Sequence, residues 1–66
     1  MREIQIGQRH RKVGASLIVW RVVAVVPDRS GIPHCRIVDE RDTTNVKLIS
    51  GKVLADTKFY QSVAQP

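Results

Sequence analysis

The feature that most constrains the fold is a dense run of β-branched residues between positions 17 and 26. Six of these ten residues are valine or isoleucine, which favour extended backbone. As a strand the run would span about 33 Å, because a strand rises about 3.3 Å per residue. That length is too great for a straight strand in a small sheet protein. We therefore predict one long strand that bends or contains a β-bulge.

Turn-forming residues recur about every 8 to 12 residues, a spacing typical of an all-β fold. The pattern predicts five strands, at residues 6–11, 17–27, 34–40, 46–49 and 59–63. Loops are predicted at 27–33 and 42–45, which contain proline, glycine, aspartate and asparagine. Before the last strand, Ser50 is placed to cap a short helical turn that points Leu54 inward. A long bent second strand, a meander, a helical turn and a closing strand predict a small five-stranded SH3-like barrel.

The length of 66 residues predicts one domain, at residues 1–63, followed by a disordered tail at 64–66. A chain this short buries only about 60% of its unfolded surface, which leaves no room for a deep substrate cavity. The single cysteine, Cys35, cannot form an internal disulfide, so we expect a cytoplasmic protein. The longest apolar stretch falls well short of the roughly 20 residues of a membrane-spanning helix, and no signal peptide is recognisable. No membrane partner is expected.

Alternation of side chains along the strands predicts two unlike faces. If Arg21 lies in solvent, then Trp20 lies in the core. The corresponding inward positions of the third and fourth strands are Cys35, Ile37, Val46 and Leu48. The outward face then mixes cationic side chains with an apolar row that needs a cover. The predicted partner interface consists of Val19, Val23, Val25, Val38 and Ile49.

Basic residues outnumber acidic ones, with 11 Lys plus Arg against 6 Asp plus Glu and a formal net charge of +5. Such an excess favours contact with phosphate groups, although a solvated basic surface is an equally good interpretation. Only three residues are aromatic, and the phase of Trp20 makes it a core anchor rather than a platform for stacking bases. The predicted nucleic-acid-binding residues are Arg9, Arg11, Lys12, Arg21, Arg36 and Lys47.

Catalytic and metal chemistry are not predicted. His34 and Cys35 are adjacent on a strand and point to opposite faces, which leaves His10 as the only other metal ligand of the kind zinc prefers. Cys35 in an inward phase behaves as a small buried hydrophobe, and no serine shows a spacing that suggests a catalytic triad. We therefore predict a protein that is not an enzyme, with no cofactor, no metal and no small-molecule substrate.

Several short segments resemble small SH3-like barrels of bacteria and their phages, the group that includes KOW-type and Tudor-like modules. They are GQRHR at 7–11, WRVVAV at 20–25, VKLIS at 46–50 and Leu54, and the resemblance covers residues 6–63. It implies a binding module, because KOW-type domains commonly contact RNA or ribosome-associated partners and Tudor-like domains bind peptides.

Two functions from different classes follow from these features. The first is a non-catalytic module that contacts nucleic acid, or an assembly that contains it, through the basic residues named above. The alternative is a protein-interaction or homo-oligomeric structural module that uses the outward valine-rich face. The first predicts salt-dependent binding to nucleic acid, and the second predicts a molecular mass that depends on protein concentration.

Overall fold

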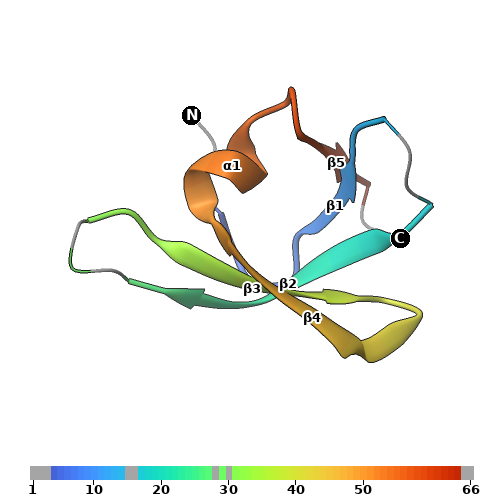
Figure 1. Cartoon of the computed structure of the whole chain (residues 1–66), viewed down its shortest axis with the longest axis horizontal. Helices are drawn as coiled ribbons and strands as arrows, with labels where there is room; N and C mark the ends of the chain where they lie inside the picture. Colours follow the sequence, from blue (N-terminus) through green and yellow to red (C-terminus); the bar gives the residue numbers. More distant parts are fainter. Residues whose placement is uncertain (1–3, 15–16, 28, 30, 65–66) are drawn as a thin grey trace.

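The computed structural model describes residues 4–14, 17–27, 29 and 31–64. Five strands form one antiparallel sheet in the order β4-β3-β2-β1-β5, and a short helix connects β4 to β5 (Figure 1). The elements are β1 Arg9–Lys12, β2 Val19–Val26, β3 His34–Asp39, β4 Asp42–Ser50, α1 Gly51–Ala55 and β5 Tyr60–Val63. The predicted all-β class is confirmed. Over the described residues, the structure has no helix of the length and apolarity needed to cross a membrane.

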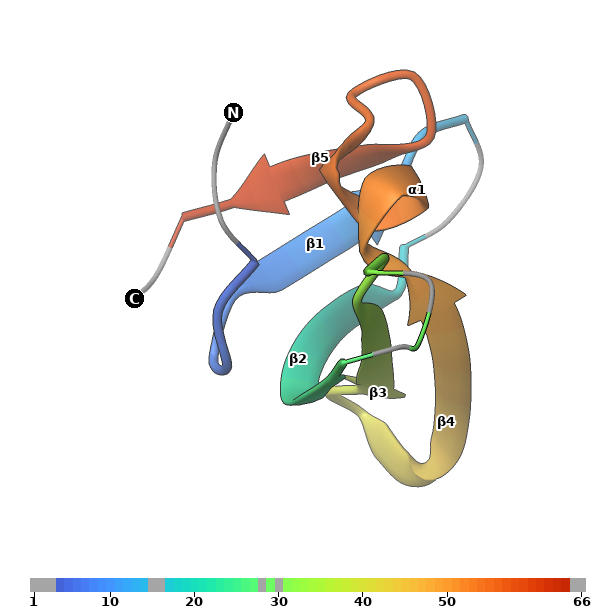
Figure 2. The same cartoon turned by 90° about the vertical axis from the view of Figure 1, so that its left-hand side faces the viewer.

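The sheet is not closed into a barrel. Within the described ranges, the two outermost strands of the sheet, β4 and β5, form no ladder with each other. Instead, α1 lies between them and contacts both, as Figure 2 shows from the side. The inner face of the sheet is defined here as the face that packs against α1, and the outer face as the opposite one.

A bulge interrupts β2, as its length predicted. The register with β3 passes from Val22 opposite Ile37 to Ala24 opposite Arg36, so that Val23 is the extra residue. An extra residue reverses the alternation of side chains beyond it. Val25 consequently packs against the core. The prediction that Val25 faces outward is wrong for this reason.

Strand β4 begins at Asp42, so residues 42–45 belong to the strand and not to the predicted loop. Its alternation is also opposite to the prediction. Ile49 pairs with Cys35 and packs against the core, whereas Val46 and Leu48 are 46% and 65% exposed. Lys47 pairs with Ile37 on the inner face, and its ammonium lies 4.7 Å from the ring centre of Trp20. A lysine can occupy the inner face because its aliphatic stem packs along apolar surface while its ammonium contacts an aromatic ring. The outward position predicted for Lys47 is therefore wrong.

The core of the described chain lies on the inner face, beneath α1. Its buried apolar residues are Trp20, Val22, Cys35, Ile37, Leu54 and Tyr60. Predictions of inward positions for Trp20, Cys35, Ile37 and Leu54 are confirmed. The helical turn is also confirmed: the hydroxyl of Ser50 caps α1 by accepting a hydrogen bond from the backbone N–H of Lys52 at 3.2 Å.

The predicted tail lies mostly outside the described residues, which end at Ala64. The carbonyl oxygen of Ala64 accepts a hydrogen bond from Nη1 of Arg9 at 2.7 Å. The chain is therefore held to β1 at least as far as Ala64.

Candidate functional site

The outer face of the sheet carries the candidate site, and the strand register shows how its side chains are arranged. One row of directly opposed residues crosses all five strands, in the order Val63, Arg9, Arg21, Val38 and Val46. Two arginines therefore stand next to each other in the middle of the row, with apolar residues on either side. Like charges directly opposite each other on neighbouring strands repel, so this pair needs an anion between its members.

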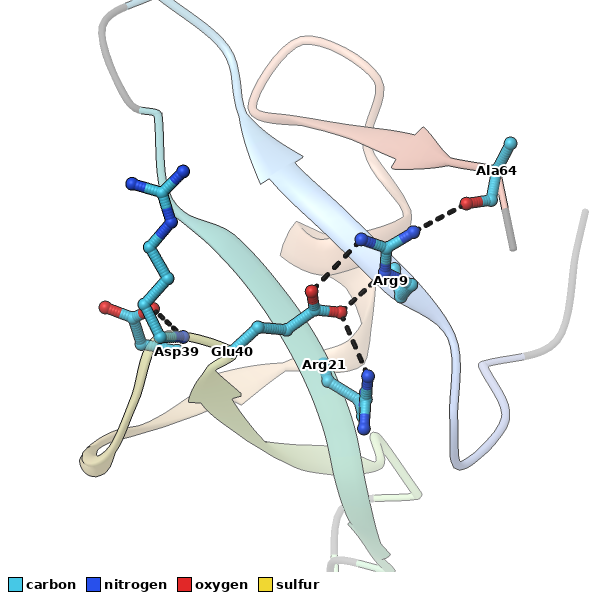
Figure 3. Close-up of polar contacts among 6 residues, drawn as sticks. Arg9, Arg21, Asp39, Glu40 and Ala64 are labelled. Atoms are coloured by element: carbon cyan, nitrogen blue, oxygen red, sulfur yellow. Dashed lines mark hydrogen bonds and ion pairs between the residues drawn. The ribbon is translucent and has the colours of Figure 1, made fainter. Parts of the chain in front are cut away.

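Glu40, at the turn between β3 and β4, supplies that anion (Figure 3). Arg9 donates through Nε to Oε1 of Glu40 at 2.5 Å and through Nη2 to Oε2 at 3.0 Å. Arg21 donates through Nη2 to Oε1 at 3.2 Å. The backbone of Glu40 is held by its own N–H, which donates to the carbonyl oxygen of Val19 at 3.0 Å.

The two arginines differ in what they have left to offer a ligand. All three guanidinium nitrogens of Arg9 are engaged, two by Glu40 and one by Ala64 (Figure 3). Arg21 uses one nitrogen, and its side chain is 52% exposed against 18% for Arg9. Arg9 is therefore a structural ion-pair partner, and Arg21 retains donors that point to solvent.

The ion pair also sets the charge state of Glu40. Hydrogen bonds from Arg9, and secondarily from Arg21, lower the pKa of Glu40 below its ordinary value. The same contact raises the pKa of Arg9. Glu40 is thus ionised at neutral pH and cancels one of the positive charges of this face.

Arg36 lies at a different point of the outer face, opposite Ala24 on one side and Leu48 on the other. It lines a shallow cleft of about 330 Å³ together with Val26, Pro27, His34 and Leu48. Within the described part of the chain, neither Arg36 nor Arg11 has an ion-pair partner. Both residues are therefore uncompensated cations of the outer face.

The structure brings together four of the six predicted nucleic-acid-binding residues. Arg9, Arg11, Arg21 and Arg36 share the outer face by register. Lys12 does not join them, because it pairs with buried Tyr60 at the end of β1 and so has the inner phase. Lys47 lies over Trp20 on the inner face and is likewise separated from them.

The residues of the predicted partner interface divide between the two faces of the sheet. Val19, Val23 and Val38 lie on the outer face, whereas Val25 and Ile49 pack against the core. Three apolar residues outside the predicted interface, Val26, Val46 and Leu48, are exposed on the outer face instead. The outer apolar side chains with substantial exposure are Val23 at 39%, Val26 at 44%, Val46 at 46% and Leu48 at 65%.

Sequence reasoning missed Glu40, although a signal for it was present. Side chains two residues apart share a face, so Arg36, Val38 and Glu40 in the predicted strand 34–40 form one outward series. Extending the series by one step places a carboxylate beside the outward arginines.

Cys35 is fully buried on the inner face, and burial raises the pKa of its thiol. Within the described ranges, no three His, Cys, Asp or Glu side chains are grouped so as to hold a metal ion. The outer face thus combines cationic and apolar side chains.

Comparison of the chain with protein-family models, with curated proteins and with solved structures finds no match.

Proposed function

We propose that this protein is a non-catalytic binding module that contacts nucleic acid, or an assembly containing nucleic acid, through the arginines of its outer face. The observation that carries the proposal is the pairing state of these arginines. Arg11 and Arg36 have no ion-pair partner in the described chain, and Arg21 is only partly engaged by Glu40.

Charge supports an anionic ligand. Four arginines share the outer face with Glu40, in a chain whose formal net charge is +5. Guanidinium groups present a planar set of donors that matches phosphate oxygens and remains charged at any physiological pH. An excess of such groups attracts polyanions and releases their condensed counterions on binding.

Spacing supports a repeated anionic ligand rather than a single ion. Arg11, Arg21 and Arg36 come from three adjacent strands, β1, β2 and β3. Arg11 and Arg36 lie two strands apart and on opposite sides of the row that contains Arg21, each two residues along its own strand. With strands about 4.8 Å apart and a rise of about 3.3 Å per residue, the three positions extend over about 16 Å, a length along which duplex DNA carries about nine phosphates. A polymer of phosphates meets all three cations at once, whereas a single phosphate does not.

The finer fold assignment is part of this proposal. We assign the chain to the small SH3-like group of bacteria and phages that includes KOW-type and Tudor-like modules, and we expect it in the cytoplasm. Support for the first comes from the strand order β4-β3-β2-β1-β5 with a short helix before the last strand. Support for the second comes from the free, buried Cys35, which is typical of a reducing compartment.

The test is binding to a labelled oligonucleotide, single-stranded and duplex, over a range of salt concentrations. Arg36→Gln and Arg11→Gln should each weaken binding and reduce the slope of log affinity against log salt by about 1. Lys52→Gln is the matched control, because it removes one positive charge from α1 on the opposite side of the sheet. An equal loss in the control, or binding that does not respond to salt, would contradict the proposal.

A second candidate is a protein-interaction or homo-oligomeric module, and one specific observation favours it. Leu48 is 65% exposed beside Arg36, and Val23, Val26 and Val46 are exposed on the same face. Light scattering over a range of protein concentrations separates the two functions. Self-association predicts a mass that rises with concentration, changes little with salt and returns to the monomer value in Leu48→Lys; a constant monomer mass removes the homo-oligomer.

A further inference from the structure

The inner side of the molecule contains a cavity between α1 and the ribbon formed by β1 and β5. Its volume is about 720 Å³. The cavity is about half open to solvent, and it lies where the sheet leaves β4 and β5 unjoined. The volume lies within the range of about 300 to 1,000 Å³ found for small-molecule sites.

Two buried polar side chains on neighbouring strands line this cavity, His10 of β1 and Tyr60 of β5. Each is only 5% exposed. The one hydrogen bond of the His10 ring joins Nε2 to Oε1 of Gln8 at 3.4 Å, and within the described residues neither Nδ1 of His10 nor the hydroxyl of Tyr60 has a partner. No described side-chain nitrogen or oxygen is both sealed from solvent and without a partner, so Nδ1 of His10 and the hydroxyl of Tyr60 each keep some accessible surface. Both residues line the cavity.

The lining carries no free charge. Burial lowers the pKa of His10 and raises the pKa of Tyr60, so both side chains are neutral near pH 7. Arg9 is also among the lining residues, but its side chain has the outer phase, and Glu40 and Ala64 engage all three of its guanidinium nitrogens. A charged ligand would enter without a counterion, which makes an uncharged one the better fit.

The other lining residues determine where a ligand would meet apolar surface and where it would meet a hydrogen-bonding group. Leu54 and Ile4, which packs against the core, provide apolar walls, and Ser62 of β5, which pairs with His10, adds a hydroxyl. A neutral imidazole and a phenol each donate or accept a hydrogen bond, so they match a ligand that has both kinds of group along one edge. A heteroaromatic ring combines such an edge with apolar faces.

We propose that this cavity binds an uncharged heteroaromatic ring, with His10 and Tyr60 forming hydrogen bonds to its polar edge and Leu54 and Ile4 contacting its faces. The ring is either a free small molecule or a base carried by a nucleic-acid strand. The site lies on the opposite face of the sheet from Arg36, so it is independent of the function proposed for the outer face.

The experiment is titration of the isotopically labelled full chain, followed by amide NMR, with adenosine, cytidine and nicotinamide in turn. We expect at least one of them to cause saturable shifts at Leu54, Tyr60 and Ser62, with a dissociation constant on the order of 1 mM or tighter. Tyr60→Phe removes only the hydroxyl and should weaken that binding about threefold to tenfold, the effect of one hydrogen bond. His10→Phe, which retains a ring of similar size, tests the imidazole in the same way.

A single-stranded oligoadenylate provides the second arm. Shifts of the cavity residues with the oligonucleotide but with none of the three small molecules identify the strand as the source of the ring. Arg36→Gln is the control and should leave the affinity for the small molecules unchanged, even if it abolishes binding to nucleic acid. The inference is overturned if none of the four probes shifts the cavity residues, or if Tyr60→Phe and His10→Phe both bind as the unaltered chain does.

Discussion

The two faces of the β2–β3 ladder alternate residue by residue along the same strands and yet are held in different ways. Val22 and Ile37 form an inner pair that is 0% exposed. The next pair along the ladder, Arg21 and Val38, lies on the outer face, and Arg21 is kept in place by the carboxylate of Glu40. Apolar packing dominates the inner face, whereas one carboxylate organises the outer face. Substitutions on the inner face should therefore change the free energy of unfolding, and those on the outer face should mainly change binding.

The largest expected effect is on the inner face. Ile37→Ala should lower the free energy of unfolding by about 2 to 5 kcal/mol, because it leaves a cavity in a fully buried site. That loss is comparable with the whole stability of a domain of this size. Val38→Ala, one residue away and half-buried on the outer face, should cost about 1 kcal/mol or less.

Urea unfolding followed by the fluorescence of Trp20, which is buried beside Ile37, measures both changes. Equal losses in the two variants would show that the outer face is as tightly packed as the inner one. In that case the comparison between the faces would fail, and a covered outer face, such as an oligomer interface, would be indicated.

How much of this contrast the sequence could predict depends on the range of the interaction concerned. The Ser50 cap and the inward position of Leu54 were predicted because both depend on a few neighbouring residues. The bulge in β2 was expected from strand length, but its position at Val23 depends on how β2 pairs with β3. The prediction took Arg21 as an outward position and alternated the faces along the whole strand. Every position of β2 beyond the bulge was therefore assigned to the wrong face.

In β4 and in the ion pair, the sequence was insufficient for a different reason. Lys47 was placed outward because it is charged, but contact with Trp20 is only available once the strands are assembled. Glu40 lies 31 residues from Arg9 in the sequence, so their contact is a product of the tertiary fold. The number of elements was therefore predictable, whereas the composition of the outer face required the register.

A smaller effect is expected when the carboxylate of the outer face is removed. Glu40→Gln takes away the anion that engages Arg9 and Arg21, so both guanidiniums become available to phosphate. Affinity for nucleic acid should rise about threefold to tenfold at low salt, and the salt slope should steepen by up to about 1. The measurement is the same oligonucleotide titration as for the arginine variants.

Asp42→Asn is the matched control for this variant. It also removes one negative charge, but Asp42 lies at the β3–β4 turn, where its carboxylate accepts hydrogen bonds from the backbone and hydroxyl of Thr44. If both variants tighten binding equally, net charge explains the gain and the arrangement of arginines around Glu40 does not.

The smallest expected effect, a change of at most one proton in the pH dependence of stability, separates the two faces by the pH at which each responds. Burial lowers the pKa of His10 in the folded chain below its ordinary value of 6.5. As the pH falls, the His10 ring of the unfolded chain therefore takes up its proton at a higher pH than that of the folded chain. The contribution of neutral His10 to stability is complete above pH 6.5 and is lost as the pH falls below that value. Glu40, whose folded pKa lies below its ordinary value of 4.5, stabilises the chain above that pH and stops doing so as the pH falls through the folded pKa.

Thermal unfolding between pH 7 and pH 3 should show both declines, with His10→Phe removing the upper one and Glu40→Gln the lower one. A profile of His10→Phe that still falls between pH 7 and pH 5 as steeply as that of the unaltered chain would mean that His10 is not held neutral by burial, and it would remove the electrostatic argument for an uncharged ligand in the cavity.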